Sequence, residues 1–169
     1  MLEGLLTLYP RVATWASDNP IKRHQAPLGL RTALLGALVE AIADPRLSLE
    51  QELSSPWAID TLERARSRWP SLQLVFVVGS DLAPQIPRWK QAAAVLGGCR
   101  LAIAPRAGWP LANADLERLR ALGAQLDVLP LQIPPSASSR IREQPDPALV
   151  PAELWPVLLQ HNLYGLTPP

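Results

Sequence analysis

The regular alternation of short apolar runs with helical patterns is the feature that most constrains how this chain can fold. The predicted strands cover residues 12–17, 47–53, 72–79, 100–104 and 125–131. The predicted helices cover residues 3–9, 26–42, 54–69 with Ser55 as its cap, a stretch after Trp89, 113–122 and 151–161. Strands that alternate with helices are typical of the α/β class, with a doubly wound, mostly parallel sheet and right-handed crossovers. We therefore expect one α/β domain over residues 1–169.

Composition and charge argue against several classes of protein. The 169 residues carry a net charge of +1 and no basic run, so we expect neither nucleic acid nor a membrane surface as the main partner. The single cysteine, Cys99, rules out an internal disulfide, and the sequence has no Cys/His cluster for a metal. The start lacks the positive region of a signal peptide, and no apolar stretch approaches the roughly 20 residues of a membrane span. We expect a cytoplasmic protein, and nothing in the sequence indicates an oligomeric state.

Polar clusters follow several of the predicted strands, at the edge where open parallel sheets bind their ligands. DNPIKRH (18–24) offers Asn19 and Lys22 for a carboxylate or phosphate, although a solvated turn explains the same residues. GSD (79–81) offers a glycine for close approach of a ligand and a carboxylate for ribose hydroxyls, although Asp81 is equally suited to capping a turn.

Two further clusters complete this edge. PRWKQ (87–91) places Trp89 between two cations, which suits an aromatic ring that carries a phosphate, although a core tryptophan is the simpler explanation. PPSASSRIRE (134–143) sets hydroxyls and arginines at a predicted helix start, where they suit a phosphate or, more simply, cap the helix. Because all four clusters fall on one edge of one predicted sheet, together they favour a nucleotide site.

Seven stretches spread over nearly the whole chain form an ordered set of motifs. They are WASDNPIK (15–22), APLGLR (26–31), SPWAIDTL (55–62), GSDLAPQIPRW (79–89), PRAG (105–108), SASSRIR (136–142) and LVPAELWPVLLQHNLYG (149–165). This set resembles the bacterial nicotinate-nucleotide adenylyltransferases, which belong to the nucleotidyltransferase superfamily with a Rossmann-like fold. The resemblance implies transfer of AMP from ATP to nicotinate mononucleotide, with Mg²⁺, giving deamido-NAD and pyrophosphate.

The resemblance also implies roles for individual residues. The ATP-binding residues would be Gly79 and Asp81 at the ribose, with Ser138, Ser139 and Arg142 at the phosphates. The mononucleotide-binding residues would be Asn19, Lys22, Trp89 and Arg106, with Trp89 stacked on the nicotinate ring. No protein nucleophile is implied, because this chemistry depends on positioning and charge neutralisation.

The chain departs from the family pattern in three places. Ala58 stands where S-P-x-T has threonine, and Ser136 and Ala137 replace isoleucine and serine of the phosphate motif. The family's opening strand, glycine-rich turn and H-x-G-H motif are not in the sequence, which starts at the helix expected after them. We therefore expect an N-terminally truncated form of the fold, no identifiable catalytic residue and little or no transfer activity.

Two other functions remain open from the sequence. The chain could be a non-catalytic remnant of the family that binds a nucleotide or a protein, which the missing H-x-G-H motif favours. It could also be a related adenylyltransferase with another acceptor such as phosphopantetheine, which Trp89 and the stretch NPIK (19–22) disfavour.

Overall fold

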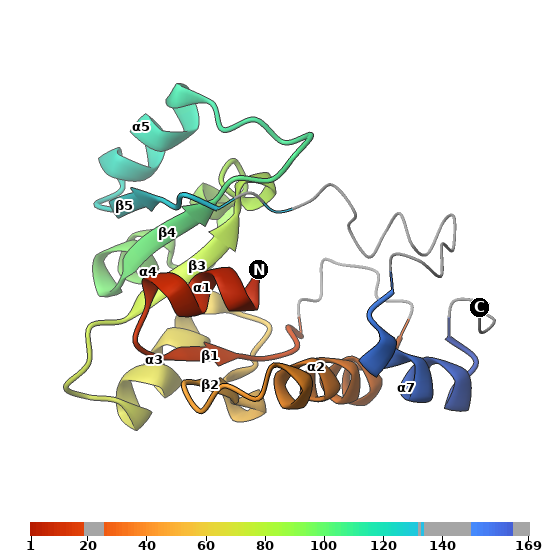
Figure 1. The fold of residues 1–169 in the computed structure, drawn as a ribbon. Helices are drawn as coiled ribbons and strands as arrows, with labels where there is room; N and C mark the ends of the chain where they lie inside the picture. The colour runs from red at the N-terminus through yellow and green to blue at the C-terminus, as the bar shows by residue number, and fades with distance from the viewer. Residues whose placement is uncertain (19–25, 132, 134–149, 164–169) are drawn as a thin grey trace. The chain divides into compact units, whose positions relative to one another are not determined.

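All five predicted strands are present in the computed structural model, and every hydrogen-bonded pair of them is parallel (Figure 1). β1 (Val12–Thr14) pairs with β2 (Leu47–Leu49). A second sheet has the order β3 (Val75–Gly79), β4 (Arg100–Ala104) and β5 (Gln125–Val128). The expected α/β class with parallel strands is confirmed.

The structure describes residues 1–18, 26–131, 133 and 150–163, and its backbone divides into two compact units. The first unit combines Met1–Ser54 with Ser136–Pro169, and the second is the continuous segment Ser55–Pro135. Of the helices that the structure describes, none has the length and apolar character needed to span a bilayer.

The helices of the second unit pack against the three-stranded sheet or against one another. Its helical segments are α3 (Ala58–Arg68), η2 (Ser80–Leu82), η3 (Ile86–Arg88), α4 (Ala92–Gly98) and α5 (Asn113–Ala121). α4 and α5 cover the same face of the sheet, because Leu96 of α4 and Leu119 of α5 belong to one core cluster with residues of β4. The buried core on this face consists of Val78, Ala83, Ile86, Leu96, Leu101, Ile103 and Leu119.

The register of the second sheet explains which residues enter that core. Phe76 lies opposite Leu101, and Val78 lies opposite Ile103. Side chains alternate between the two faces of a strand, so these pairs share one face and form apolar rows under the helices. The same register sets Gly79 opposite Ala104, so β3 and β4 end level with each other.

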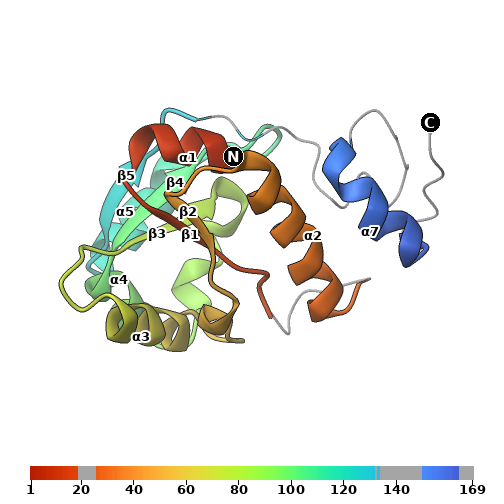
Figure 2. The same cartoon turned by 60° about the horizontal axis from the view of Figure 1, so that its bottom comes forward.

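The first unit is held together by side-chain contacts to backbone groups. Its helices are α1 (Leu2–Leu8), α2 (Leu28–Ile42), η1 (Gln51–Leu53), η5 (Ala152–Leu154) and α7 (Trp155–Gln160), and α7 packs beside α2 (Figures 1 and 2). The Gln51 amide donates to the Ala16 carbonyl at 3.0 Å and accepts the Ala16 N–H at 2.9 Å. Ser54 Oγ donates to the same carbonyl at 2.9 Å.

These contacts correct the prediction of a strand over residues 47–53. The strand ends at Leu49, and residues Gln51–Leu53 form a 3₁₀ turn instead. The Gln51 side chain occupies the backbone groups of Ala16 that a longer strand would have paired with. Alternating polarity could not show this, because the competing hydrogen bonds come from residues far away in the sequence.

The predicted start of the third helix is also corrected. α3 begins at Ala58, and Trp57 occupies the N-cap position without a side-chain hydrogen bond. Ser55 is therefore not the cap residue. Its hydroxyl accepts the Trp57 N–H at 3.2 Å and donates to Asp60 Oδ2 at 2.9 Å, so it fixes the turn that leads into the helix.

An open pocket of about 520 Å³ lies at the amino ends of the second sheet. Its lining includes Arg66, Cys99 and Arg100, and burial raises the pKa of the Cys99 thiol. Arg100 forms an ion pair with Asp127 across the strands, and this hydrogen bond lowers the pKa of the Asp127 carboxyl. Because parallel sheets bind ligands beyond their carboxyl ends, we place the candidate site at the opposite edge.

Candidate functional site

The candidate site of the second unit is built on the loops that follow β3 and β4. Since Gly79 and Ala104 are level in the register, the residues directly after them lie side by side. This edge carries the GSD and PRAG motifs, which are separated by more than 20 residues in the sequence. The parallel pairing is therefore what brings Asp81 and Arg106 together.

Asp81 and Arg106 form a partly buried ion pair. Arg106 Nη1 donates to Asp81 Oδ2 at 3.0 Å, and only 21% of the arginine and 18% of the aspartate side chain are exposed. Arg106 Nε is buried and has no hydrogen-bond partner among the described residues. The pair thus fixes one carboxylate oxygen while it leaves donors of the guanidinium available for an anionic ligand.

Gly79 provides the space that the Asp81 carboxylate occupies. A Cβ built on Gly79 would overlap Asp81 Oδ1, so a larger residue would push the carboxylate away. The glycine is needed here for close approach of a side chain, since its own backbone is extended, with φ −74°.

Ser80 joins the two loops through its buried hydroxyl. Ser80 is only 3% exposed, and its Oγ accepts the Arg106 N–H at 2.9 Å and donates to the Trp109 carbonyl at 2.7 Å. The Trp109 N–H closes the turn by donating to the Arg106 carbonyl at 3.0 Å, and Gly108 supplies the required positive φ of 82°. The loop after β4 is therefore held at both ends of its turn.

Ile133 supports the same loop from the other side. Its N–H donates to the Pro105 carbonyl at 2.8 Å, and its carbonyl accepts the Ala107 N–H at 3.1 Å. These two bonds form a parallel bridge to Arg106, so the backbone that carries the guanidinium is tied to two neighbouring segments.

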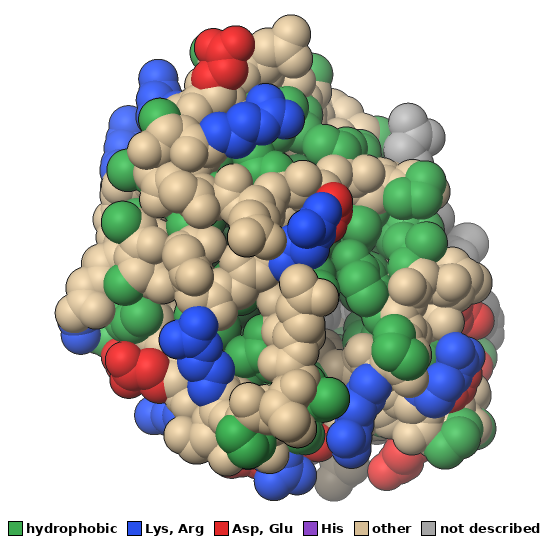
Figure 3. Space-filling model, turned by 90° about the vertical axis from the view of Figure 1, so that its left-hand side faces the viewer, with side chains coloured by type: hydrophobic (Ala, Val, Ile, Leu, Met, Phe, Trp, Pro, Cys, Tyr) green, Lys and Arg blue, Asp and Glu red, His purple; other side chains and the backbone are tan. Residues whose placement is uncertain are grey.

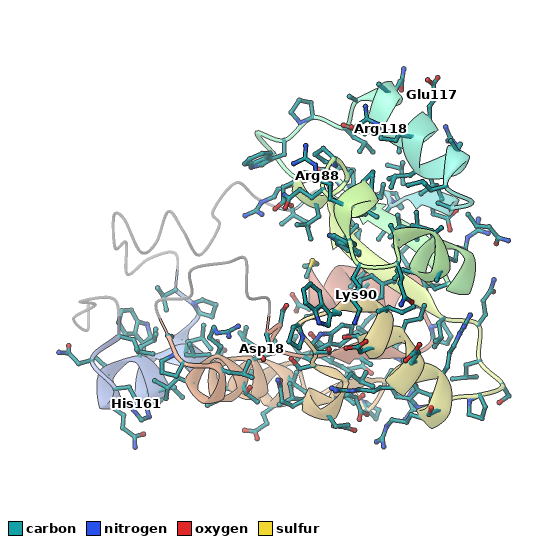
Figure 4. The ribbon with its side chains drawn as sticks, turned by 180° about the vertical axis from the view of Figure 1, so that it is seen from behind. Asp18, Arg88, Lys90, Glu117, Arg118 and His161 are labelled. Atoms are coloured by element: carbon teal, nitrogen blue, oxygen red, sulfur yellow. The ribbon has the colours of Figure 1, made fainter. Side chains whose placement is uncertain are left out.

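Trp89 packs against the core of the second unit. It is partly buried, and its ring lies edge-on to Phe76 with the centroids 6.1 Å apart. The two cations beside it do not form one cluster, because the labelled side chains of Arg88 and Lys90 lie well apart (Figure 4). Lys90 Nζ lies 5.5 Å from the ring centroid of Trp57.

Five predicted site residues fall outside the described part of the chain. They are Asn19, Lys22, Ser138, Ser139 and Arg142. The structure therefore brings together Gly79, Asp81 and Arg106 of the predicted set and places Trp89 in the same unit. In the first unit, His161 is the exposed C-cap of α7 (Figure 4).

Sequence reasoning missed Ser80 and Trp109. Ser80 lies inside the GSD motif, between the two residues that were selected, and Trp109 directly follows PRAG. The available signal was the position of both at the carboxyl ends of adjacent parallel strands, where loop residues meet.

The charged groups of the described residues do not form a metal centre. No three His, Cys, Asp or Glu side chains in residues 1–18, 26–131, 133 and 150–163 lie close enough to hold an ion. On the face shown in Figure 3, basic and acidic side chains are interspersed over the described part of the surface. At the candidate site, Arg106 is a cation that an anionic ligand could contact.

Comparison with known proteins relates most of the chain to one enzyme family, although no protein-family model matches it. The chain is 34% identical to a probable nicotinate-nucleotide adenylyltransferase of Synechocystis sp., over 92% of this chain and 86% of that protein. A protein of the same name from Gemmatimonas aurantiaca is 30% identical, over 76% of this chain and 63% of its own length. A third, from Chlorobaculum tepidum, is 29% identical over 92% and 84% of the two chains.

Solved structures show the same fold at low sequence identity. Plasmodium falciparum nicotinic acid mononucleotide adenylyltransferase complexed with NaAD superposes with a TM-score of 0.73 and 14% identity, over 98% of this chain and 88% of that one. The same enzyme complexed with APC gives a TM-score of 0.63 and 17% identity, over 84% and 78%. The chain therefore has the Rossmann-like nucleotidyltransferase fold.

Proposed function

The chain belongs to the nicotinate-nucleotide adenylyltransferase family of nucleotidyltransferases, and we propose that it binds ATP and nicotinate mononucleotide for adenylyl transfer in NAD biosynthesis. The observation that carries this proposal is the 34% identity to such a protein over 92% of the chain. We place the protein in the cytoplasm together with its nucleotide substrates.

Within the second unit, we assign ATP to the loop edge after β3 and β4. Asp81 keeps Oδ1 for a ribose hydroxyl, because the ion pair with Arg106 occupies Oδ2. Gly79 makes this geometry possible by leaving room for the carboxylate. Arg106 then presents its remaining donors to a phosphate or to the carboxylate of the mononucleotide.

The remaining assignments follow from the family motifs. The ATP phosphates go to Ser138, Ser139 and Arg142, and the mononucleotide goes to Asn19 and Lys22 with Trp89 against its ring. Mg²⁺ enters with ATP, since this ion is commonly held by substrate phosphates and few carboxylates. An oxygen of the mononucleotide phosphate attacks the α-phosphorus in line, the bond to the β-phosphate oxygen breaks, and pyrophosphate leaves.

A titration of the chain with each substrate tests this function. In calorimetric titrations, we expect nicotinate mononucleotide and a non-hydrolysable ATP analogue to bind to the chain, and we expect phosphopantetheine not to bind. Arg106→Ala should raise the Kd of at least one of these two ligands about tenfold or more, because it removes charge-assisted hydrogen bonds and leaves Asp81 unpaired. Arg120→Ala, which removes an exposed cation from α5, is the matched control. Binding of phosphopantetheine in place of the mononucleotide would identify a different acceptor.

A second candidate function is nucleotide binding without transfer. The residues assigned above bind and position the two substrates, and the same contacts would serve a protein that binds them without transfer. Incubation with ATP, Mg²⁺ and nicotinate mononucleotide separates the two, because transfer releases pyrophosphate and deamido-NAD in equal amounts. Binding of both substrates without either product would support the non-catalytic function.

A further inference from the structure

We infer that Trp109 is an aromatic platform for the adenine ring of ATP, at the end of the loop that follows β4. This inference rests on the proposed function, since it assigns one more contact to the same nucleotide site. Trp109 was not among the residues selected from the sequence, and it is placed at the site by the structure alone.

Exposure first distinguishes Trp109 from the other aromatic side chains of the second unit. The residue is 55% exposed, although an indole is among the largest apolar groups a protein can leave in water. Trp57 is also exposed, at 40%, but the ammonium group of Lys90 covers its ring. Among the described residues, no aromatic or cationic group stacks on Trp109.

The backbone of Trp109 is fixed although its side chain is exposed. Its carbonyl is held by the buried hydroxyl of Ser80 at 2.7 Å, and its N–H is held by the Arg106 carbonyl at 3.0 Å. If the backbone of the loop were not ordered, both the loop and the exposed side chain would lose conformational entropy when a ligand binds. A side chain whose backbone is already ordered loses less, so the platform is preorganised.

The surroundings of Trp109 fit a nucleotide. The turn that it closes begins at Arg106, whose guanidinium is bound to Asp81, the residue assigned to the ribose. A base attached to that ribose needs a flat apolar surface, and the indole supplies one at the same edge of the sheet. Stacking on an aromatic side chain accepts any base, so Trp109 would strengthen binding without selecting adenine over guanine.

Calorimetric titration of the full chain and three variants tests the inference, with a non-hydrolysable ATP analogue and nicotinate mononucleotide as separate ligands. Trp109→Ala should raise the Kd of the ATP analogue by roughly 5- to 150-fold, the range found for loss of one base stack. Trp109→Phe, which keeps an aromatic face, should stay within about threefold of the original chain. Leu72→Ala is the control, because it truncates a side chain of similar exposure, 51%, before β3.

The second ligand separates stacking from loss of structure. If Trp109 only supports the loop that carries Arg106, Trp109→Ala will weaken both ligands by similar factors, which would overturn the inference. An unchanged Kd for the ATP analogue would overturn it as well, as would weakening of the mononucleotide alone. If the unsubstituted chain binds neither ligand, the proposed function fails together with the inference. If it binds both and Trp109→Ala changes nothing, only the inference fails.

Discussion

Replacing Ser80 with alanine should destabilise the second unit far more than the loss of one hydroxyl group would suggest. The Ser80 hydroxyl is buried and makes two hydrogen bonds, one to the Trp109 carbonyl and one from the Arg106 N–H. The Trp109 carbonyl loses one hydrogen-bond donor, which costs about 1 kcal/mol. The Arg106 N–H is left without a partner next to the core, which costs about 1–3 kcal/mol more.

The expected decrease in the free energy of unfolding is therefore about 2–4 kcal/mol. Urea unfolding followed by tryptophan fluorescence measures it, with Ser67→Ala as the matched control. Ser67 lies on α3 and its hydroxyl bonds only to the Glu63 carbonyl at the surface, so its removal should change stability by less than about 0.5 kcal/mol. Equal effects of the two substitutions would refute the role of Ser80 in holding the loop.

Three further predictions concern the same unit. Leu119→Ala should lower the free energy of unfolding by about 2–5 kcal/mol in urea, because the leucine is fully buried and its removal leaves a cavity. The hydrogen bond from Arg100 lowers the pKa of Asp127, so this pair stabilises the fold at pH values above the ordinary carboxyl pKa. The stabilisation should be lost as the pH falls through the pKa that Asp127 has in the folded chain. Asp127→Asn should abolish that part of the pH dependence of the urea midpoint. Burial raises the pKa of Cys99, so its thiol should react with a disulfide reagent more slowly in the folded chain at pH 8 than in urea, and equal rates would contradict the burial.

The strands and helices could be predicted from local patterns, because each is encoded by residues close together in the sequence. The strand over residues 100–104 and the helix that begins at residue 113 agree with the structure at those ends. The error at the end of the second strand occurred because a distant residue intervenes. Gln51 ends β2 early by binding the backbone of Ala16, and no periodicity within residues 47–53 records that contact.

The candidate site could be predicted only in part. The motifs identified Gly79, Asp81 and Arg106 individually, but they assigned Asp81 to ATP and Arg106 to the mononucleotide. The structure joins these two residues in one ion pair, because the register of β3 and β4 sets their loops level. The bridging role of Ser80 depends on the same register, which no single motif contains.

The division of the chain into one continuous and one discontinuous unit has a consequence for its synthesis. Residues 55–135 leave the ribosome as a complete set, and their strands pair in the order in which they are made. The second unit can therefore fold before translation ends, as local contacts favour. The first unit must wait for its later segment, which begins at Ser136, and then close a loop as long as the whole second unit. Until that later segment has been made, α2 lacks its contacts with η5 and α7, so its uncovered apolar side chains are the part of the first unit most in need of a chaperone.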